Sequence, residues 1–181
     1  MELDKAIQSL KKVKKFCDKS PDWRDIIEAV DSSRYVLMAG GNNTARFVIV
    51  SDKEKIQKIT DATQQPFISD AKYAVIVCSS GKRTKNLYGE KAENYLRQQA
   101  GAAIQNFMLK LSGSGLSSAW IRLFDEEMVK KILDVPENVD IEGIFPVGYD
   151  TKELGKQPKK SEIDLDRILF FNKYGNKKMK K

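Results

Sequence analysis

Apolar residues in the first thirty positions recur three and four apart, the spacing of one buried helix face. In the first helix these residues are Leu3, Ala6, Ile7, Leu10 and Val13. Four lysines at positions 11, 12, 14 and 15 should end that helix, where cations also suit the helix dipole. Ser20 and Pro21 then suit the N-cap and first turn of a second helix that buries Trp23, Ile26, Ile27 and Val30.

Short apolar and β-branched runs predict the strands of a sheet. Four of them are FVIVSD (47–52), YAVIVCSS (73–80), SSAWIRLF (117–124) and IEGIFPVGYD (141–150), and RILFF (167–171) could form a fifth. Helical patterns lie between the runs, with Asp52 and Asp125 as N-caps of two of the helices. This alternation predicts an α/β or α+β domain in which helices cover one sheet.

The longest helical pattern runs from about Ala92 to Ser114. Small residues at positions 100–103 allow other backbones to approach closely, and Phe107 and Leu111 continue an apolar face. Gly115 is a suitable C-terminal stop. We expect this helix to be central and nearly buried.

Composition narrows the class of protein. With 181 residues, 41% apolar and 31% charged, the chain suits one globular domain. No apolar run is long enough for a membrane helix and the N-terminus lacks a signal-peptide core, so we expect a cytoplasmic protein without a membrane partner. The absence of histidine removes the usual metal ligand and the base of Ser-His or Cys-His catalysis. We therefore expect no metal site, and a buried thiol at Cys78.

The net charge of +7 lies mostly near the C-terminus. Residues 151–181 hold ten basic and four acidic residues, a net +6, which leaves +1 for residues 1–150. A nearly neutral body argues against a broad nucleic-acid surface. The end NKKMKK has no aromatic residue among its lysines, so a disordered basic tail over 176–181 is favoured over a nucleic-acid site.

The block Gly101–Tyr149 is similar to the nitroreductase family in several features that follow one another in the right order. They are a long central helix, a Gly-Leu turn, a Trp-containing strand, an acid-capped helix, Leu-x-x-Pro and a closing Pro-x-Gly-Tyr strand. Outside this block, LKKVKKF resembles the family's RRSxRxF segment, AGGNNTARFVIV its Asn loop, and PKKSEIDLDRILFF its basic C-terminal arm.

The resemblance implies a nitroreductase-like α+β fold, a three-layer domain with a central mixed sheet flanked by helices, which forms homodimers with shared active sites. The domain would span 1–175, and its arm at about 151–175 would cross to the partner subunit. The family's members are FMN-dependent oxidoreductases in which NAD(P)H reduces FMN. The flavin then reduces a small-molecule acceptor such as a quinone or nitro compound.

The resemblance also implies which residues bind the cofactor. The phosphate or the flavin pyrimidine edge would meet Lys11, Lys12, Lys14, Lys159 and Lys160. The ring would meet Asn42, Asn43 and Thr44, and N5 would lie beside Trp120, Ile121, Arg122 and Leu123. No side chain need act as a catalytic acid or base, because the flavin carries the hydride chemistry.

Four positions depart from the family pattern: Leu10 replaces an arginine, Lys12 a serine, Gly41 an asparagine and Arg122 a small residue. A shift of one residue would bring Asn42 to the third of these positions. The departures leave an alternative function open, that of a non-catalytic member which has lost tight flavin binding and acts as a binding or structural protein. They also leave two readings of Arg122, a gate beside the flavin or a side chain directed to solvent.

Overall fold

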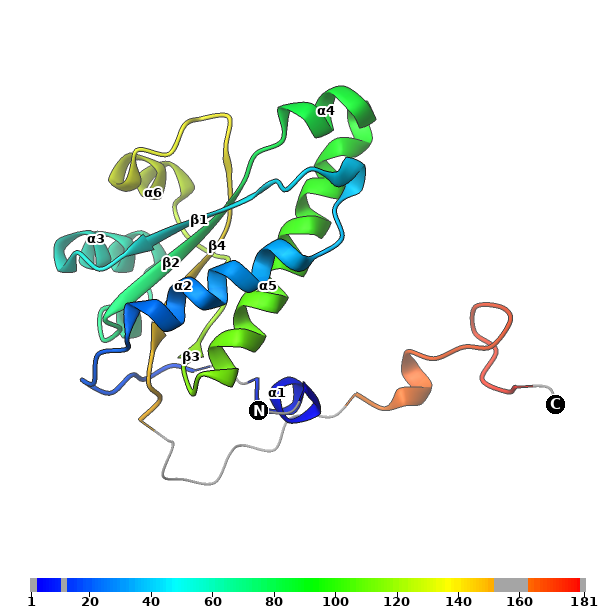
Figure 1. The fold of residues 1–181 in the computed structure, drawn as a ribbon, viewed down its shortest axis with the longest axis horizontal. Coiled ribbons are helices and arrows are strands. Elements are labelled where there is room, and N and C mark those ends of the chain that lie inside the picture. The colour runs from blue at the N-terminus through cyan, green and yellow to red at the C-terminus, as the bar shows by residue number, and fades with distance from the viewer. Residues whose placement is uncertain (1–2, 11–12, 152–162, 180–181) are drawn as a thin grey trace.

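The computed structural model of the chain describes residues 3–10, 13–151 and 163–179. Its sheet has the strand order β1-β2-β4-β3 (Figure 1). The strands are β1 (Ala45–Val50), β2 (Tyr73–Ser79), β3 (Ser117–Ser118) and β4 (Asp140–Gly148). The α+β fold with flanking helices is confirmed.

All described strand pairs are antiparallel, so the expectation of a mixed sheet is wrong for these strands. The connection between β1 and β2 shows the reason. The chain leaves β1 at Val50 and enters β2 at Tyr73, and Val50 pairs with Ala74. The intervening helix therefore returns to the same end of the sheet, whereas parallel strands need a crossover to the opposite end.

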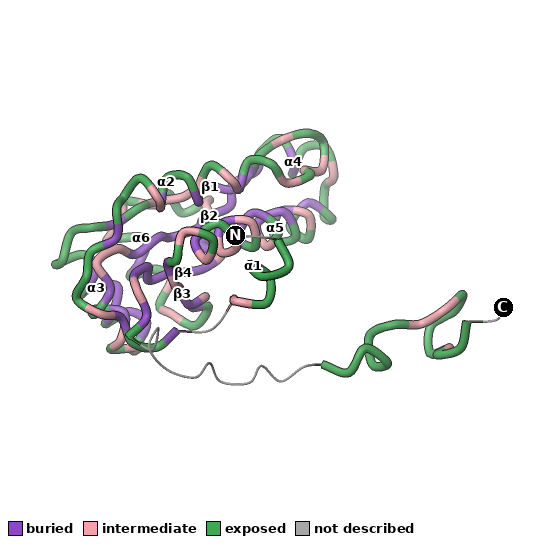
Figure 2. Tube along the Cα trace, turned by 60° about the horizontal axis from the view of Figure 1, so that its bottom comes forward, coloured by how far each residue is buried: buried purple, intermediate pink, exposed green. Residues whose placement is uncertain are grey.

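The sheet is the middle of three layers (Figures 1 and 2). Helices α2 (Trp23–Ser32) and α5 (Ala92–Gly113) cover one face, where Phe107 packs with Val75, Val77 and Phe145. Helices α3 (Lys53–Thr63) and α6 (Glu126–Leu133) cover the other face, where Ile59 and Val129 pack with Ile76 and Ile144. Successive β2 residues thus serve opposite halves of the core, as the alternation of strand side chains requires.

Several predicted boundaries are confirmed by the structure. Helix α5 spans the predicted central helix, and Gly115 follows it with φ +75°, a conformation suited to glycine. The carboxylate of Asp52 accepts from the N–H groups of Glu54 and Lys55, and that of Asp125 accepts from Met128 N–H. Two helices complete the set, α1 (Leu3–Ser9) and α4 (Lys82–Tyr88), of which α4 had no clear sequence signal.

Other predictions at the termini of elements are wrong. Helix α1 ends at Ser9, before the lysines, and Phe16 beyond them forms an antiparallel bridge to Asp150, which requires extended backbone there. The N-cap of α2 is Asp22, whose carboxylate accepts from Arg24 N–H, so Pro21 lies just outside the helix.

Two predicted strands differ from the structure as well. The third is ladder-paired only at Ser117 and Ser118, with a single further bridge from Ile121 to Ile144. RILFF forms no strand: Leu165–Arg167 is one 3₁₀ turn and the next residues are irregular. Within the described chain no strand partner lies beside RILFF, and an isolated strand has no ladder to stabilise it.

Residues 163–179 lie apart from the body of the molecule (Figure 1). Six large hydrophobic residues of this segment are exposed: Ile163, Leu165, Ile168, Leu169, Tyr174 and Met179. No described helix is long and apolar enough to cross a membrane.

Candidate functional site

Strand β4 brings together two of the segments that the sequence singled out. At its C-terminal end, Cys17 N–H donates to Tyr149 O at 2.9 Å, and Lys19 Nζ lies 4.3 Å from the centroid of the Tyr149 ring. The Phe16 ring covers Gly148 so closely that an added Cβ there would lie 2.9 Å from Phe16 Cδ1. These contacts fix the segment that carries Lys14, whose side chain is exposed to solvent.

The second segment, Trp120–Leu123, runs beside the middle of β4. Ile121 and Ile144 exchange both backbone hydrogen bonds at 3.0 Å. The Trp120 indole donates to Glu142 O at 3.1 Å and packs on Phe145 with a centroid separation of 5.8 Å. Gly143 makes room for the indole, since a Cβ there would lie 2.4 Å from Trp120 Nε1. Trp120 is thus a fixed wall at the edge of the sheet.

The backbone opens to solvent directly after Ile121. Arg122 and Leu123 are exposed, and their N–H groups have no acceptor among the described residues. The chain is held on both sides of this pair, because Asp125 N–H donates to Ala62 O at 2.9 Å. Two adjacent amide donors are therefore held in place and free to bind a ligand acceptor.

The Arg122 guanidinium stacks over the Trp120 ring, 5.1 Å from its centroid. A cation over an indole face is attracted by the ring quadrupole, which holds this long side chain against the wall. Neither sequence reading of Arg122 is complete, since the side chain is exposed but also held.

The Asn loop lies at the other end of the sheet. It precedes Ala45, which pairs with Ser79, and Ser79 pairs in turn with Asp140 at the start of β4. Phe16 and its neighbouring Lys14 lie beyond the opposite end of β4, at Asp150. Trp120–Leu123 run antiparallel to β4 from opposite Ile144 toward its start, so one chain places them nearer to the Asn-loop end of the sheet than to Lys14.

Side chains of the Asn loop differ in their availability. Thr44 is fully buried, and its hydroxyl donates a hydrogen bond to Gln99 Oε1 at 3.3 Å in the interior of the protein. Asn43 Oδ1 accepts from Ala45 N–H at 3.1 Å, whereas Asn42 is half-buried. The Asn42 side chain makes no hydrogen bond to the described residues, so its amide is available to a ligand.

Four of the predicted phosphate residues, Lys11, Lys12, Lys159 and Lys160, lie outside the described residues. Leu10, one of the departures from the family pattern, lies half-buried at a small cavity that Ser9 and Ser112 also line. The hydroxyl oxygens of these two serines are 2.7 Å apart.

No group of acidic, cysteine or histidine residues among the described parts of the chain could hold a metal ion. Cys78 is buried in the core, as predicted. Burial raises the pKa of its thiol to about 11, which keeps it protonated near neutral pH.

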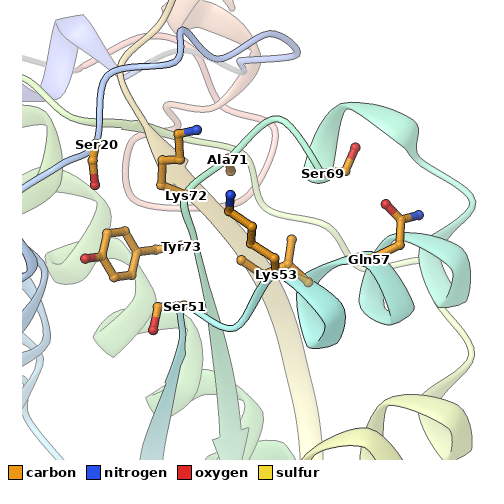
Figure 3. Close-up of a pocket in the computed structure, with 9 residues that line it drawn as sticks. Ser20, Ser51, Lys53, Gln57, Ser69, Ala71, Lys72 and Tyr73 are labelled. Atoms are coloured by element: carbon orange, nitrogen blue, oxygen red, sulfur yellow. The ribbon is translucent and has the colours of Figure 1, made fainter.

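Sequence reasoning missed a surface cavity of about 480 Å³ where β1 ends and β2 begins (Figure 3). Two lysines, Lys53 and Lys72, line it from different elements. The two lysines are nineteen positions apart and neither belongs to a run of basic residues, so the pattern gave no signal that they meet.

Comparison with known proteins decides the family. The family model described as "Nitroreductase family" matches residues 61–149, which span the chain from α3 to the end of β4. The chain belongs to the nitroreductase family. The sequence features that first suggested it, from the central helix to the Pro-x-Gly-Tyr strand, lie within the matched range.

Relatives within the nitroreductase family cover nearly the whole chain. A protein of Archaeoglobus fulgidus with the provisional name NADH dehydrogenase/NAD(P)H nitroreductase is 24% identical over 91% of this chain and 94% of its own. A nitroreductase family protein of Streptococcus pneumoniae has the same fold, with a TM-score of 0.83, 20% identity and coverage of 93% and 98%. The structure of an iodotyrosine deiodinase bound to FMN and 3-iodo-L-tyrosine has a TM-score of 0.75 and 21% identity, and the match covers 90% of this chain and 97% of that one.

Proposed function

We propose that this nitroreductase-family protein is an FMN-dependent NAD(P)H oxidoreductase that reduces a quinone, nitro compound or similar small acceptor. The observation that carries the proposal is the pair of unpaired amide donors at Arg122 and Leu123, held beside the Trp120 wall. Bound FMN would supply hydride transfer, which no side chain of this chain can supply.

The residues present fit a flavin in three ways. The Arg122 and Leu123 amides can donate to an acceptor nitrogen of the ring system. Lys14 supplies an exposed cation beyond the end of β4, which suits a phosphate or the electron-rich pyrimidine edge. Trp120 excludes water from one side and keeps the two amides in position, so the chain contributes orientation and charge rather than acid-base chemistry.

We further propose that the site is completed by a second subunit. Lys14 lies beyond the end of β4 at Asp150, while the Asn loop lies at the opposite end of the sheet in the same chain. A two-fold partner could bring its own Asn42 toward the first subunit's Lys14, because a symmetric interface presents each surface twice. The single domain over 1–175, with an arm that reaches the partner, belongs to this proposal.

The alternative is a family member that binds no flavin, and the exposed Arg122 favours it only if the guanidinium leaves Trp120 and covers the amides. In the structure it rests on the indole instead. The oxidoreductase is therefore the better supported function.

The experiment is a flavin titration of the purified protein followed by visible absorbance. We expect stoichiometric FMN binding and NAD(P)H oxidation that depends on an added quinone or nitro compound. Lys14→Gln should weaken FMN binding about tenfold, a loss of about 1.4 kcal/mol. Lys15→Gln removes the adjacent exposed lysine and is the matched control. A protein that gains no flavin absorbance with excess FMN would contradict the proposal and leave the non-catalytic alternative.

A further inference from the structure

The cavity between the end of β1 and the start of β2 is a second concave site on this molecule (Figure 3). Its volume of about 480 Å³ is within the usual range of small-molecule pockets, roughly 300–1,000 Å³. Separate parts of the chain form it: Ser20 before α2, Ser51 after β1, the first turns of α3 with Lys53, Ile56 and Gln57, and Ser69 and Ala71–Tyr73 at the entry to β2.

Two ammonium groups face this cavity. Figure 3 shows the side chains of Lys53 and Lys72 beside the same cavity, extending from different elements. Lys72 forms a hydrogen-bonded ion pair with Asp18, a residue whose side chain is 97% exposed. That hydrogen bond lowers the pKa of Asp18, and Lys53 adds to the lowering by its charge. Two cations thus share one carboxylate, and the cavity keeps an excess positive charge.

The remaining walls combine hydroxyls with apolar surface. The Ser51 hydroxyl has no hydrogen-bond partner among the described residues, and Ser20 Oγ reaches only Pro21 O at 3.4 Å. Ile56 and Ala71 are buried side chains that line the same cavity. Such a lining suits a ligand with an anionic group and a small apolar body.

We propose that this cavity binds a small phosphate monoester. Its dianionic phosphate would lie between Lys53 and Lys72, where two ammonium groups offer charge-assisted hydrogen bonds to several oxygens. The ester's organic part would lie on Ile56 and Ala71. In the free protein the Asp18 carboxylate is paired with Lys72. It therefore competes with the ligand, because the phosphate must displace this carboxylate from the ammonium group.

This site is separate from the proposed flavin site. Ser51 and Lys53 follow β1, which is one edge strand of the sheet, whereas Trp120–Leu123 run beside β4 next to the other edge strand, β3. Two strands, β2 and β4, lie between the edges. Ligands at the two sites would bind at different places in the same subunit.

The test is a titration of the full-length protein with phenyl phosphate, followed by amide shifts in nuclear magnetic resonance spectra. We expect saturable shifts at Ser51, Lys53 and Lys72, and weaker binding of benzenesulfonate, a monoanion of similar shape. Lys53→Gln combined with Lys72→Gln should weaken phenyl phosphate binding at least tenfold. Lys55→Gln, an exposed change on the same helix outside the cavity, should leave it unchanged.

Asp18→Asn makes the test sharper because it predicts a gain. Removal of the competing carboxylate should tighten phenyl phosphate binding severalfold, and this exposed position carries no core contacts. Shifts that do not saturate, equal affinity in the double variant, or weaker binding by Asp18→Asn would each overturn the proposal. The FMN affinity of the Lys53→Gln, Lys72→Gln double variant should equal that of the parent protein. The phosphate-site proposal can therefore be contradicted independently of the proposed flavin site.

Discussion

At the scale of single residues, a glycine fixes the wall of the proposed flavin site. Gly143 lies in β4 directly under the Trp120 indole, and a methyl group there would overlap both Nε1, at 2.4 Å, and Cδ1, at 2.6 Å. The atoms in the way belong to a ring that is itself held by Phe145 and by the Glu142 carbonyl. The indole has little room to yield.

We therefore expect Gly143→Ala to lower the free energy of unfolding by about 1–3 kcal/mol, the usual cost of overpacking. Denaturant unfolding followed by tryptophan fluorescence would measure the loss. Gly113→Ala is the matched control, because a Cβ at that position in the last turn of α5 meets nothing within 4 Å. Equal stability of the two variants would contradict the close packing of Trp120 on Gly143.

A second residue-scale prediction concerns pH. The Lys72 hydrogen bond lowers the pKa of Asp18, so Lys72→Gln should return that pKa toward its ordinary value. A carboxyl with a lowered pKa in the folded state stabilises the fold above its unfolded pKa, and the contribution is lost as pH falls through the folded pKa. Asp18 is fully exposed, so the expected effect is on its titration and not on stability. The measurement is the pH midpoint at which the nuclear magnetic resonance chemical shift of the Asp18 carboxyl carbon changes. An unchanged midpoint in Lys72→Gln would count against the ion pair.

At the scale of elements, the helix α6 depends on its cap to enter the core at the right angle. The Asp125 carboxylate accepts from Met128 N–H at 3.0 Å, and Asp125 N–H donates to Ala62 O in α3. Val129, one turn later, is fully buried against the sheet. The cap thus joins the exposed Arg122-Leu123 turn to a fixed helix.

Asp125→Ala should lower the free energy of unfolding by about 1 kcal/mol, because an N–H in the first turn of α6 loses its acceptor. Asp125→Ser keeps a capping oxygen and should recover most of that stability. Thermal unfolding of the two variants beside the parent protein would measure the difference. If Ala and Ser are equally destabilising, the side chain acts through something other than the cap.

Helices and strands of this fold were predictable because apolar residues recur with different spacing in each. Repeats near 3.6 located α5, and β-branched runs located β1, β2 and β4, with Asp52 and Asp125 marking helix starts. Strand direction was not predictable, since α3 returns to the same end of the sheet and no local pattern encodes that return. Lys53 and Lys72 belong to separate elements, so their meeting is a tertiary result that neither segment shows alone.

At the scale of the whole molecule, the described chain exposes several large apolar side chains on its first two helices and its C-terminal segment. On α1 and α2, the side chains of Leu3, Ile7, Trp23 and Ile27 are exposed, and the separate segment 163–179 exposes several more. Large exposed apolar patches usually mark an interface. The proposed partner subunit would cover them and complete the flavin site in one step.

Introducing negative charges at apolar positions of the arm tests this arrangement. Ile168→Asp with Leu169→Asp should shift a dimer toward monomer in light scattering, because the apolar side chains would lose their cover on the partner while each subunit stays folded. Both positions are exposed in the single chain, so the substitutions remove no core contact. Lys173→Asp changes the charge of the same segment by the same amount and should leave the dimer intact.

The same variants separate assembly from chemistry. If the site is shared, the double variant should lose FMN together with its partner, and higher protein concentration should restore both by mass action. Loss of dimers with unchanged FMN affinity would contradict a shared site and place the whole flavin contact within one chain. A parent protein that is monomeric in light scattering would contradict the interface itself.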